Sequence, residues 1–177
     1  RAIEDVKIIF PFKGYMDDAN ESYKNIANSV FSCLSPGSKI LDLGCGPADK
    51  PAILQKLGFE CTGYDDMSDE WHKLNGNKNK IIKFAKEAKV KLIISKKRND
   101  FLKKESFDML MSNDMLEHLH DSPRVLLNEF LGYLKPGGYI LITVPNAVNI
   151  RKRIAVIRGK TNLPDFHTYY WSPGSWR

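Results

Sequence analysis

Residues 40–49 read ILDLGCGPAD, a short apolar run that leads into two glycines and an acid. The apolar part predicts a buried strand, and Gly–Cys–Gly at 44–46 predicts a loop that opens into a helix over 51–57. Asp49 is placed to cap that helix, and Gly58 is placed to end it. A glycine loop between a strand and a helix is typical of ligand-binding α/β sheets. This stretch therefore indicates both the fold and the position of its site.

Strand and helix patterns alternate along the remaining sequence. The predicted strands are 39–43, 59–64, 90–94, 107–111 and 138–144, and the predicted helices are 18–34, 51–57, 78–89, 123–134 and 149–159. The sequence KPGG at 135–138 predicts a turn before the last strand. Neighbouring parallel strands need a crossover, which is usually a helix. We therefore predict an α/β fold with a mostly parallel sheet, helices on both faces and ligands beyond the carboxyl ends of the strands.

Length and composition fit one globular domain. The chain has 177 residues, 42% of them hydrophobic and 27% charged, with a formal net charge of +6. Its three cysteines form no CxxC pair, which favours reduced thiols over a disulfide framework or a zinc site. No apolar run is long enough to span a bilayer, and no basic leader precedes an apolar signal core. We expect a cytoplasmic protein or a fragment of one.

Acidic residues in and beside the glycine loop indicate which ligand it binds. A dinucleotide loop has the pattern GxGxxG, but the third glycine position holds Asp49, and Asp42 lies close by. A carboxylate at a helix start repels a pyrophosphate and attracts a cation. S-adenosylmethionine fits this requirement, because it carries an ammonium and a sulfonium and no phosphate. It is the expected cofactor, with S-adenosylhomocysteine as the product.

The next two strand ends carry acids that suit the same ligand. Asp65 closes the second strand, where an acid can accept hydrogen bonds from two ribose hydroxyls. Asp100 follows the third strand and can accept from an adenine amino group, with Phe101 beside it as an apolar wall. Asp66 also follows the second strand, and either acid could hold the ribose; we favour Asp65.

Five segments together resemble class I S-adenosylmethionine-dependent methyltransferases, in particular the group with ubiquinone-pathway O-methyltransferases and bacterial small-molecule methyltransferases. They are ILDLGCGPAD (40–49), GYDD (63–66), RNDF (98–101), SFDMLMSNDMLEHLHD (106–121) and LKPGGYILITVPN (134–146). The resemblance implies a Rossmann-like sheet. It also implies that Gly44, Cys45 and Gly46 lie against the methionine portion of the cofactor, and that Asn113 lies beside it.

The resemblance also suggests a division of the chain. We expect one methyltransferase domain over 1–177, with a helical cap at 1–37, a cofactor-binding core at 38–146 and a substrate-side helix and loop at 147–177. The family's sheet closes with two further strands, which we expect to be missing here, so that the domain is truncated. An uncovered apolar edge would favour low stability or a homodimer.

The stretch NDMLEHLHD at 113–121 allows three interpretations. Asp114, Glu117 and His118 have the spacing of one helical face. The acids could simply stabilise a helix start, or His118 could be a general base oriented by Glu117. The third interpretation is a metal site, because a similar arrangement binds metal in small-RNA 2′-O-methyltransferases, with His167 as a further ligand here. We assign His118 and Glu117 as the candidate catalytic residues and predict no metal.

The predicted activity is methyl transfer to oxygen or nitrogen of a small-molecule acceptor. Residues 144–160 resemble methyltransferases found with bacterial surface-polysaccharide biosynthesis, which favours a sugar-linked acceptor. The candidate lining residues of the acceptor pocket are Tyr15, Met16, Tyr169, Tyr170 and Trp171.

Two other functions remain open. Residues 78–104 hold eleven Lys and Arg against two acids, so the chain could be an RNA methyltransferase. Few aromatic residues interrupt this segment for base stacking, which makes nucleic acid the less favoured partner. The other alternative is a non-catalytic scaffold that keeps the methyltransferase fold.

Overall fold

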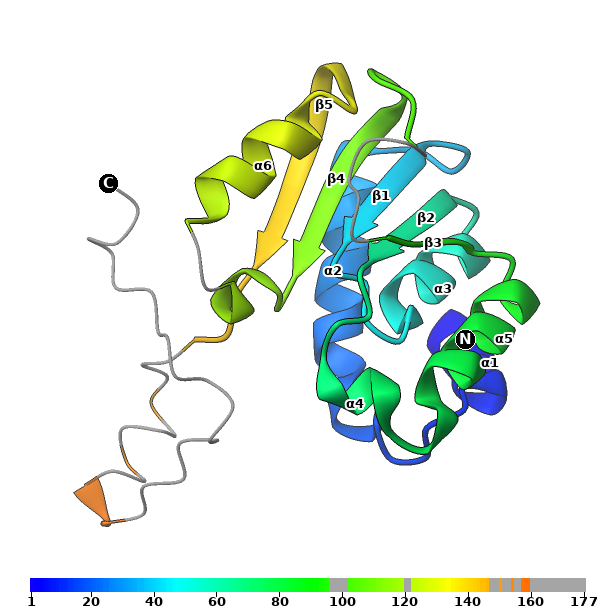
Figure 1. The fold of residues 1–177 in the computed structure, drawn as a ribbon, viewed down its shortest axis with the longest axis vertical. Helices are drawn as coiled ribbons and strands as arrows, with labels where there is room; N and C mark the ends of the chain where they lie inside the picture. The colour runs from blue at the N-terminus through cyan, green and yellow to red at the C-terminus, as the bar shows by residue number, and fades with distance from the viewer. Residues whose placement is uncertain (96–101, 120–121, 147–149, 151–153, 155–156, 160–177) are drawn as a thin grey trace.

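The computed structural model describes residues 1–95, 102–119, 122–146, 150, 154 and 157–159. Its sheet has five parallel strands in the order β3-β2-β1-β4-β5 (Figure 1). The strands are β1 (Lys39–Leu43), β2 (Glu60–Asp65), β3 (Lys91–Ile94), β4 (Phe107–Asn113) and β5 (Leu134–Thr143). The α-helices are α1 (Ala2–Ile9), α2 (Asn20–Cys33), α3 (Asp49–Lys56), α4 (Glu70–Lys73), α5 (Asn77–Glu87) and α6 (Pro123–Leu131). Short 3₁₀ turns are η1 (Asp17–Ala19), η2 (Leu74–Gly76) and η3 (Leu116–His118). The predicted Rossmann-like α/β fold is confirmed.

Helices cover both faces of the sheet because alternate strand residues are apolar on both sides. On one face, α2 and α3 pack on a cluster that includes Ile40 and Met109. On the other face lies α6 (Figure 1). Its Phe130 packs with Leu41 and Leu110. Successive residues of β1 thus serve opposite faces, as strand geometry requires. A third cluster joins α1, α3 and α5, so the N-terminal cap is packed on the core.

Helix α6 ends three residues before its predicted end. It stops at Leu131, and Gly132 and Tyr133 form the connection to β5. Their carbonyls accept hydrogen bonds from the backbone N–H groups of Glu105, Ser106 and Phe107. Leu134 itself already pairs with Phe107 as the first residue of β5, so the chain must leave the helix before it.

The predicted KPGG turn is a bulge inside β5. Phe107 pairs with Leu134, but Met109 pairs with Tyr139, so residues 135–138 loop out of register. Gly137 supplies the positive φ of 77° that the bulge needs. Lys135 at its start donates to Asp108 Oδ1 at 2.6 Å, which attaches the bulge to β4.

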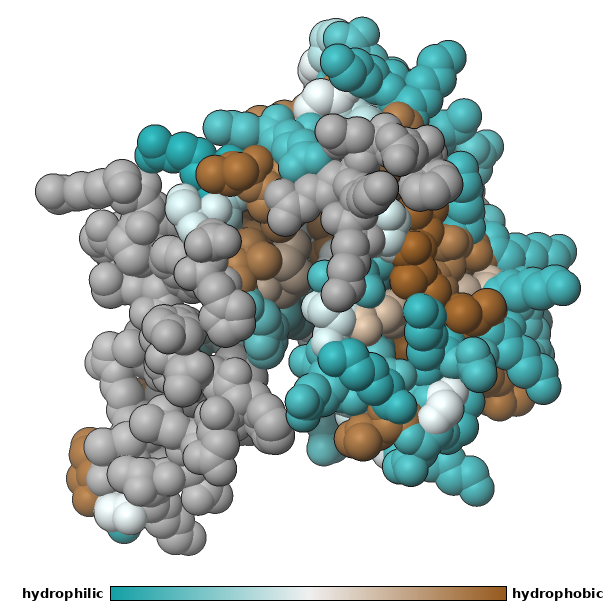
Figure 2. Space-filling view, in the orientation of Figure 1, coloured by the Kyte–Doolittle hydropathy of each residue, from teal (hydrophilic) through white to brown (hydrophobic). Residues whose placement is uncertain are grey.

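Strand β5 lies at the edge of the sheet within the described residues and pairs there with β4 alone. Its side chains are partly exposed: Tyr139 45%, Ile140 49%, Ile142 39% and, just after the strand, Val144 51%. Figure 2 shows hydrophobic side chains on the surface around α6 and β5. The expected homodimer and the missing strands stay predictions. Within the part of the chain that is described, no helix has the length and apolar character to cross a membrane.

Candidate active site

Two of the predicted cofactor-binding residues, Asp42 and Asn113, lie side by side at the carboxyl ends of neighbouring strands. Asp42 near the end of β1 pairs in register with Gly63 of β2 and Met111 of β4. Asn113 ends β4 and donates from Nδ2 to Asp42 Oδ1 at 3.4 Å. The Asn113 side chain in turn accepts from Thr143 Oγ1 of β5 at 3.2 Å. A chain of polar side chains therefore runs across three neighbouring strands at the predicted edge.

The glycine loop is attached to the end of β2 by backbone hydrogen bonds. The N–H groups of Gly44 and Cys45 donate to the Tyr64 carbonyl at 2.8 and 3.3 Å. The N–H of Gly46 donates to Asp65 Oδ2 at 2.8 Å, and Asp65 Oδ1 accepts from the N–H of Met67 at 2.7 Å. Asp65 is thus held by both of its oxygens while it supports the loop. Each oxygen keeps a further lone pair for a ligand.

Gly44 is required by a close approach as well as by its backbone angle. Its φ is 64°, in the left-handed region where glycine carries no steric cost. A Cβ at this position would overlap Met115 Cγ and lie 2.9 Å from Met115 Cβ. Met115 follows β4, so a side chain from beyond the neighbouring strand covers the first turn of the loop. No sequence motif indicates this role of Met115.

Asp42 is a buried carboxylate with an unused oxygen. It is 2% exposed, and among the residues that the structure describes its Oδ2 has no hydrogen-bond partner. Burial raises its pKa to about 7; the charge of Lys50 opposes this, and the nearby Asp49 adds to it. An unpaired carboxyl oxygen in such a place is costly unless a donor or a cation reaches it. This is the feature that fits a positively charged ligand.

Asp49 does not cap α3, so the prediction of a cap is wrong. Ala48 precedes the helix with a left-handed φ of 65°, and no side chain caps the helix there. Asp49 is the first helical residue and is 2% exposed. The Tyr23 hydroxyl of α2 donates to its Oδ2 at 2.5 Å, which ties the N-terminal cap to the loop. Burial and the Asp49 carboxylate raise the pKa of Tyr23.

Asp65 and Asp66 have different surroundings. Asp65 is buried, which raises its pKa, although the N–H bonds from Met67 and Gly46 and the adjacent His72 act in the opposite direction. Asp66 is exposed and accepts from the N–H of Ser68 at 2.8 Å, in a local turn of its own. Asp65 is therefore the acid that is built into the site. His72, a buried neighbour of Asp65, is a further residue that sequence reasoning missed.

The predicted shared helical face of Asp114, Glu117 and His118 is wrong. Asp114 has a φ of 52°, outside any helix, and only η3 is helical in this stretch. Asp114 turns instead toward α3, where Lys50 Nζ lies 3.8 Å from its Oδ2. Glu117 is 7% exposed, whereas His118 is exposed. The described residues include no group of three or more His, Cys, Asp or Glu that could hold a metal ion.

Several predicted residues lie outside the part that the structure describes. They are Asp100, Phe101, His167, Tyr169, Tyr170 and Trp171.

A family model described as a methyltransferase domain matches residues 18–176. The chain belongs to the class I S-adenosylmethionine-dependent methyltransferases.

Two methyltransferases indicate the range of its relatives. Phosphoethanolamine N-methyltransferase 3 of Arabidopsis thaliana is 34% identical over 117 residues, which cover 62% of this chain and 21% of that protein. Ubiquinone biosynthesis O-methyltransferase of Xanthomonas campestris is 27% identical over 129 residues, covering 69% of this chain and 49% of that one. The chain thus spans between a fifth and a half of the length of these relatives.

A solved methyltransferase has the same fold. Phosphoethanolamine N-methyltransferase 2 of Haemonchus contortus, in complex with phosphomonomethylethanolamine and S-adenosylhomocysteine, aligns with a TM-score of 0.56 at 22% identity. The alignment covers 89% of this chain and 37% of that one.

The N-terminal cap of the methyltransferase domain lies close to the site. Burial, and then the charges of the Asp49 and Asp114 carboxylates, raise the pKa of Tyr15. The Tyr15 ring is 48% exposed, which leaves it accessible at the rim. Met16 is 2% exposed, packs in the core with Tyr23 and lines a hollow in the cap.

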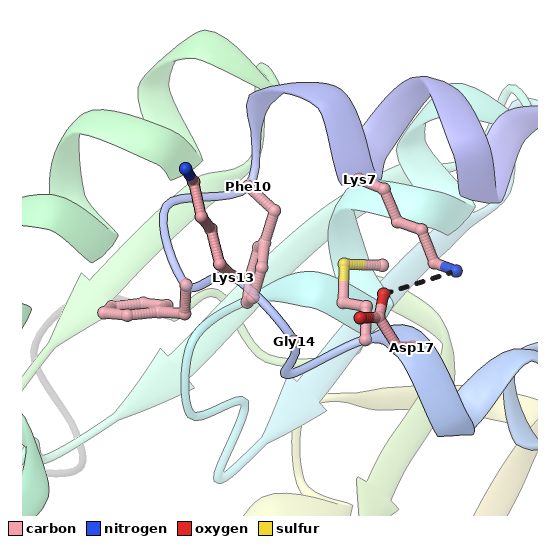
Figure 3. Close-up of a pocket in the computed structure, with 7 residues that line it drawn as sticks. Lys7, Phe10, Lys13, Gly14 and Asp17 are labelled. Atoms are coloured by element: carbon pink, nitrogen blue, oxygen red, sulfur yellow. Dashed lines mark ion pairs between the residues drawn. The ribbon is translucent and has the colours of Figure 1, made fainter.

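Two hollows flank this region. One, of about 280 Å³, lies in the cap and is lined in part by Lys7, Lys13 and Asp17 (Figure 3). Lys7 is 4.0 Å from Asp17, and none of the predicted cofactor residues lines this hollow. The other, of about 420 Å³, lies beyond β2 and is lined in part by Asp66 and His72. Only the second adjoins the strand ends.

Proposed function

We propose that this chain transfers a methyl group from S-adenosylmethionine to oxygen or nitrogen of a small-molecule acceptor. The observation that carries the proposal is the buried, unpartnered Oδ2 of Asp42 beside a glycine loop that Asp65 holds in place. Two relatives are named for phosphoethanolamine and for ubiquinone biosynthesis, both of which involve small molecules. Their names support the acceptor class and leave its identity open.

The residues present fit the cofactor. Asp42, Asp49 and Asp65 are buried together, and Lys50 is the cation whose charge reaches Asp42. This excess of negative charge suits a ligand with an ammonium and a sulfonium, and disfavours a pyrophosphate. In the proposal, Asp65 holds the ribose hydroxyls, while Gly44, Cys45 and Gly46 let the methionine portion approach the backbone. When bound, S-adenosylmethionine supplies a methyl group that its sulfonium has already activated.

The protein's own task is then mainly alignment. In the proposal, Asn113 and the glycine loop fix the cofactor, and the acceptor is held in line with the methyl group. This alignment supplies most of the rate enhancement. His118 is exposed next to the buried Glu117 at the end of β4. In our proposal, His118 takes the proton of a hydroxyl acceptor while Glu117 holds this turn in place. An amine that binds neutral needs less of this assistance.

A two-stage experiment tests the proposal. The first stage is a thermal-shift titration with S-adenosylmethionine and S-adenosylhomocysteine, because a ligand that binds the folded state raises Tm by mass action. The second stage measures transfer of labelled methyl to phosphoethanolamine, a dihydroxybenzoate and free or lipid-linked sugars. Binding followed by transfer to one of these supports the proposal. Binding without transfer to any acceptor would favour the scaffold, and no binding would reject the cofactor.

A further inference from the structure

A lysine-rich surface covers α5 and its flanking turns. It consists of Lys73, Lys78, Lys80, Lys83, Lys86, Lys89 and Lys91, all exposed. Glu87 is the one acid between Lys73 and Lys91. We call these seven residues the lysine face. The proposed cofactor site has the opposite charge, so the methyl-transfer chemistry does not explain this surface.

The positive charge of the lysine face is not neutralised by ion pairs within the part of the chain that is described. None of its lysines forms an ion pair with a described carboxylate; Lys80 alone has a marked contact, 5.9 Å above the ring of Phe12. Lys80, Lys83 and Lys86 follow one another at a spacing of three residues, which brings like charges together on one helix. The first turn of α5 has no acid and contains Lys78, although this end of a helix is already positive. The surface therefore has a strong positive potential.

Two large apolar side chains lie within this charged surface. Ile82 is 43% exposed and stands between Lys78 and Lys86, four residues away on either side along the helix. Leu74, in the turn before α5, is 56% exposed. Figure 2 shows the mostly hydrophilic cover of this side of the molecule, interrupted by isolated hydrophobic residues. A soluble polyanion makes no use of such residues, whereas a bilayer interface takes up both charge and apolar side chains.

We propose that the lysine face binds an anionic lipid surface, with Ile82 and Leu74 at the headgroup boundary. Each lysine near such a surface contributes about a fivefold gain in affinity, so several together suffice for reversible binding. No aromatic residue of α5 is exposed for base stacking, since Phe84 is 2% exposed, which disfavours single-stranded RNA as the partner. Lys73 and Lys78 of the lysine face also line the hollow of about 420 Å³ beside Asp66, at the end of β2. The proposal does not depend on the methyl-transfer activity.

Vesicle sedimentation tests the proposal. The protein is mixed with vesicles of phosphatidylcholine alone or with about one third phosphatidylserine, at low and physiological salt. We expect binding to the anionic vesicles only. Reversal of three charges, Lys83→Glu with Lys86→Glu and Lys89→Glu, should reduce it by at least about 100-fold. None of these three residues lines either hollow, and all three are exposed without a described ion pair, so the fold should stay intact, which a melting curve checks.

A matched variant separates the lysine face from net charge. Lys24→Glu with Lys103→Glu and Lys104→Glu changes three exposed lysines elsewhere and alters the net charge equally. It should keep most of the vesicle binding. Ile82→Gln should weaken vesicle binding several-fold and leave the affinity for a uridine oligonucleotide unchanged. Absence of binding to anionic vesicles, equal losses in both triple variants, or tighter binding to the oligonucleotide than to vesicles would each overturn the proposal.

Discussion

The N–H of Gly46 donates a 2.8 Å hydrogen bond to Oδ2 of Asp65, which fixes the glycine loop to the end of β2. Through this bond, the residue proposed to hold the ribose also shapes the loop proposed to hold the methionine portion. One side chain therefore supports both halves of the proposed cofactor site. Its second oxygen, bonded to the N–H of Met67, anchors the turn that follows β2.

Asp65→Ala should loosen the loop even without ligand. The N–H groups of Gly46 and Met67 lose their acceptor, and we expect hydrogen exchange at both amides to accelerate at least tenfold. Exchange measured by NMR gives this result residue by residue. Asp66→Ala is the control: within the described part of the chain the Asp66 side chain accepts from the Ser68 N–H alone, so its loss should leave the Gly46 amide protected.

Gly44→Ala should destabilise the domain through Met115. Alanine at a φ of 64° costs about 1–2 kcal/mol, and its Cβ would overlap the Met115 side chain. Met115→Ala in the same chain removes the overlap with Cγ and should recover part of the loss, leaving the backbone cost and the 2.9 Å approach to Cβ. Urea unfolding of both single variants and the double variant measures this coupling. Strict additivity of the two changes would contradict the contact.

Asp42→Asn should raise stability at neutral and higher pH. The pKa of Asp42 is about 7 in the folded protein, above the value of about 4 in an unfolded chain, so its charged form disfavours folding. Between about pH 4 and pH 7 the Asp42 carboxyl is protonated in the folded state and ionised in the unfolded state. The loss of folding stability therefore grows over this range and is constant above it. The variant should therefore gain about 2–4 kcal/mol at about pH 8 and nothing below about pH 4.

Cofactor binding should depend on pH for the same reason. A cationic ligand favours the ionised Asp42, so its affinity should rise as the pH increases from about 6 to about 8, and then level off. Titration calorimetry in two buffers of different ionisation heat detects the accompanying proton release. Asp42→Asn should bind more weakly and lose this pH dependence. A stable variant with unchanged affinity would remove Asp42 from the site.

Asp108→Asn should destabilise the opposite end of the sheet. Asp108 accepts from Lys135 Nζ at 2.6 Å and from the Lys39 N–H at 2.8 Å. Burial acts against its charge, but these two bonds prevail and lower its pKa. Its stabilisation is present above the unfolded pKa and lost as the pH falls through the folded value. Because the pair is partly exposed, we expect about 1 kcal/mol at pH 7, fading below about pH 4, in paired unfolding curves.

The proposed role of His118 is tested by measuring kcat, KM and the pH–rate profile of a variant. If it removes the acceptor proton, His118→Gln should lower kcat about 100-fold, keep KM for the cofactor and remove the acidic limb of the pH–rate profile. A spectator would leave kcat and the profile unchanged. Glu117→Gln, which changes a buried group beside it, should alter the profile less than His118→Gln does if Glu117 only positions this turn.

The sheet could be predicted because strands and helices have distinct local periodicities. The positions of Asp42 and Asp65 then followed, because the carboxyl ends of parallel strands meet at one edge of the sheet. Sequence patterns failed where a distant partner decides the geometry. Asp49 has the side chain of a helix cap, but it lies inside α3 and accepts a hydrogen bond from Tyr23 of α2. Residues 114–118 had helical spacing, but the bond from the Asp114 N–H to the Thr143 carbonyl and the Lys50 contact hold Asp114 in a left-handed conformation. Met115 and His72 act through packing and burial, which leave no motif.

Calorimetric titration of S-adenosylmethionine into the wild-type chain, Asp65→Ala and Asp66→Ala tests the central claim most directly. We predict one site in the wild type, a loss of at least about 100-fold in Asp65→Ala, since a charged hydrogen-bonding group contributes about 1.5–3 kcal/mol or more, and less than about threefold in Asp66→Ala. Equal affinity of all three chains, or no heat of binding in the folded wild type, would contradict the account.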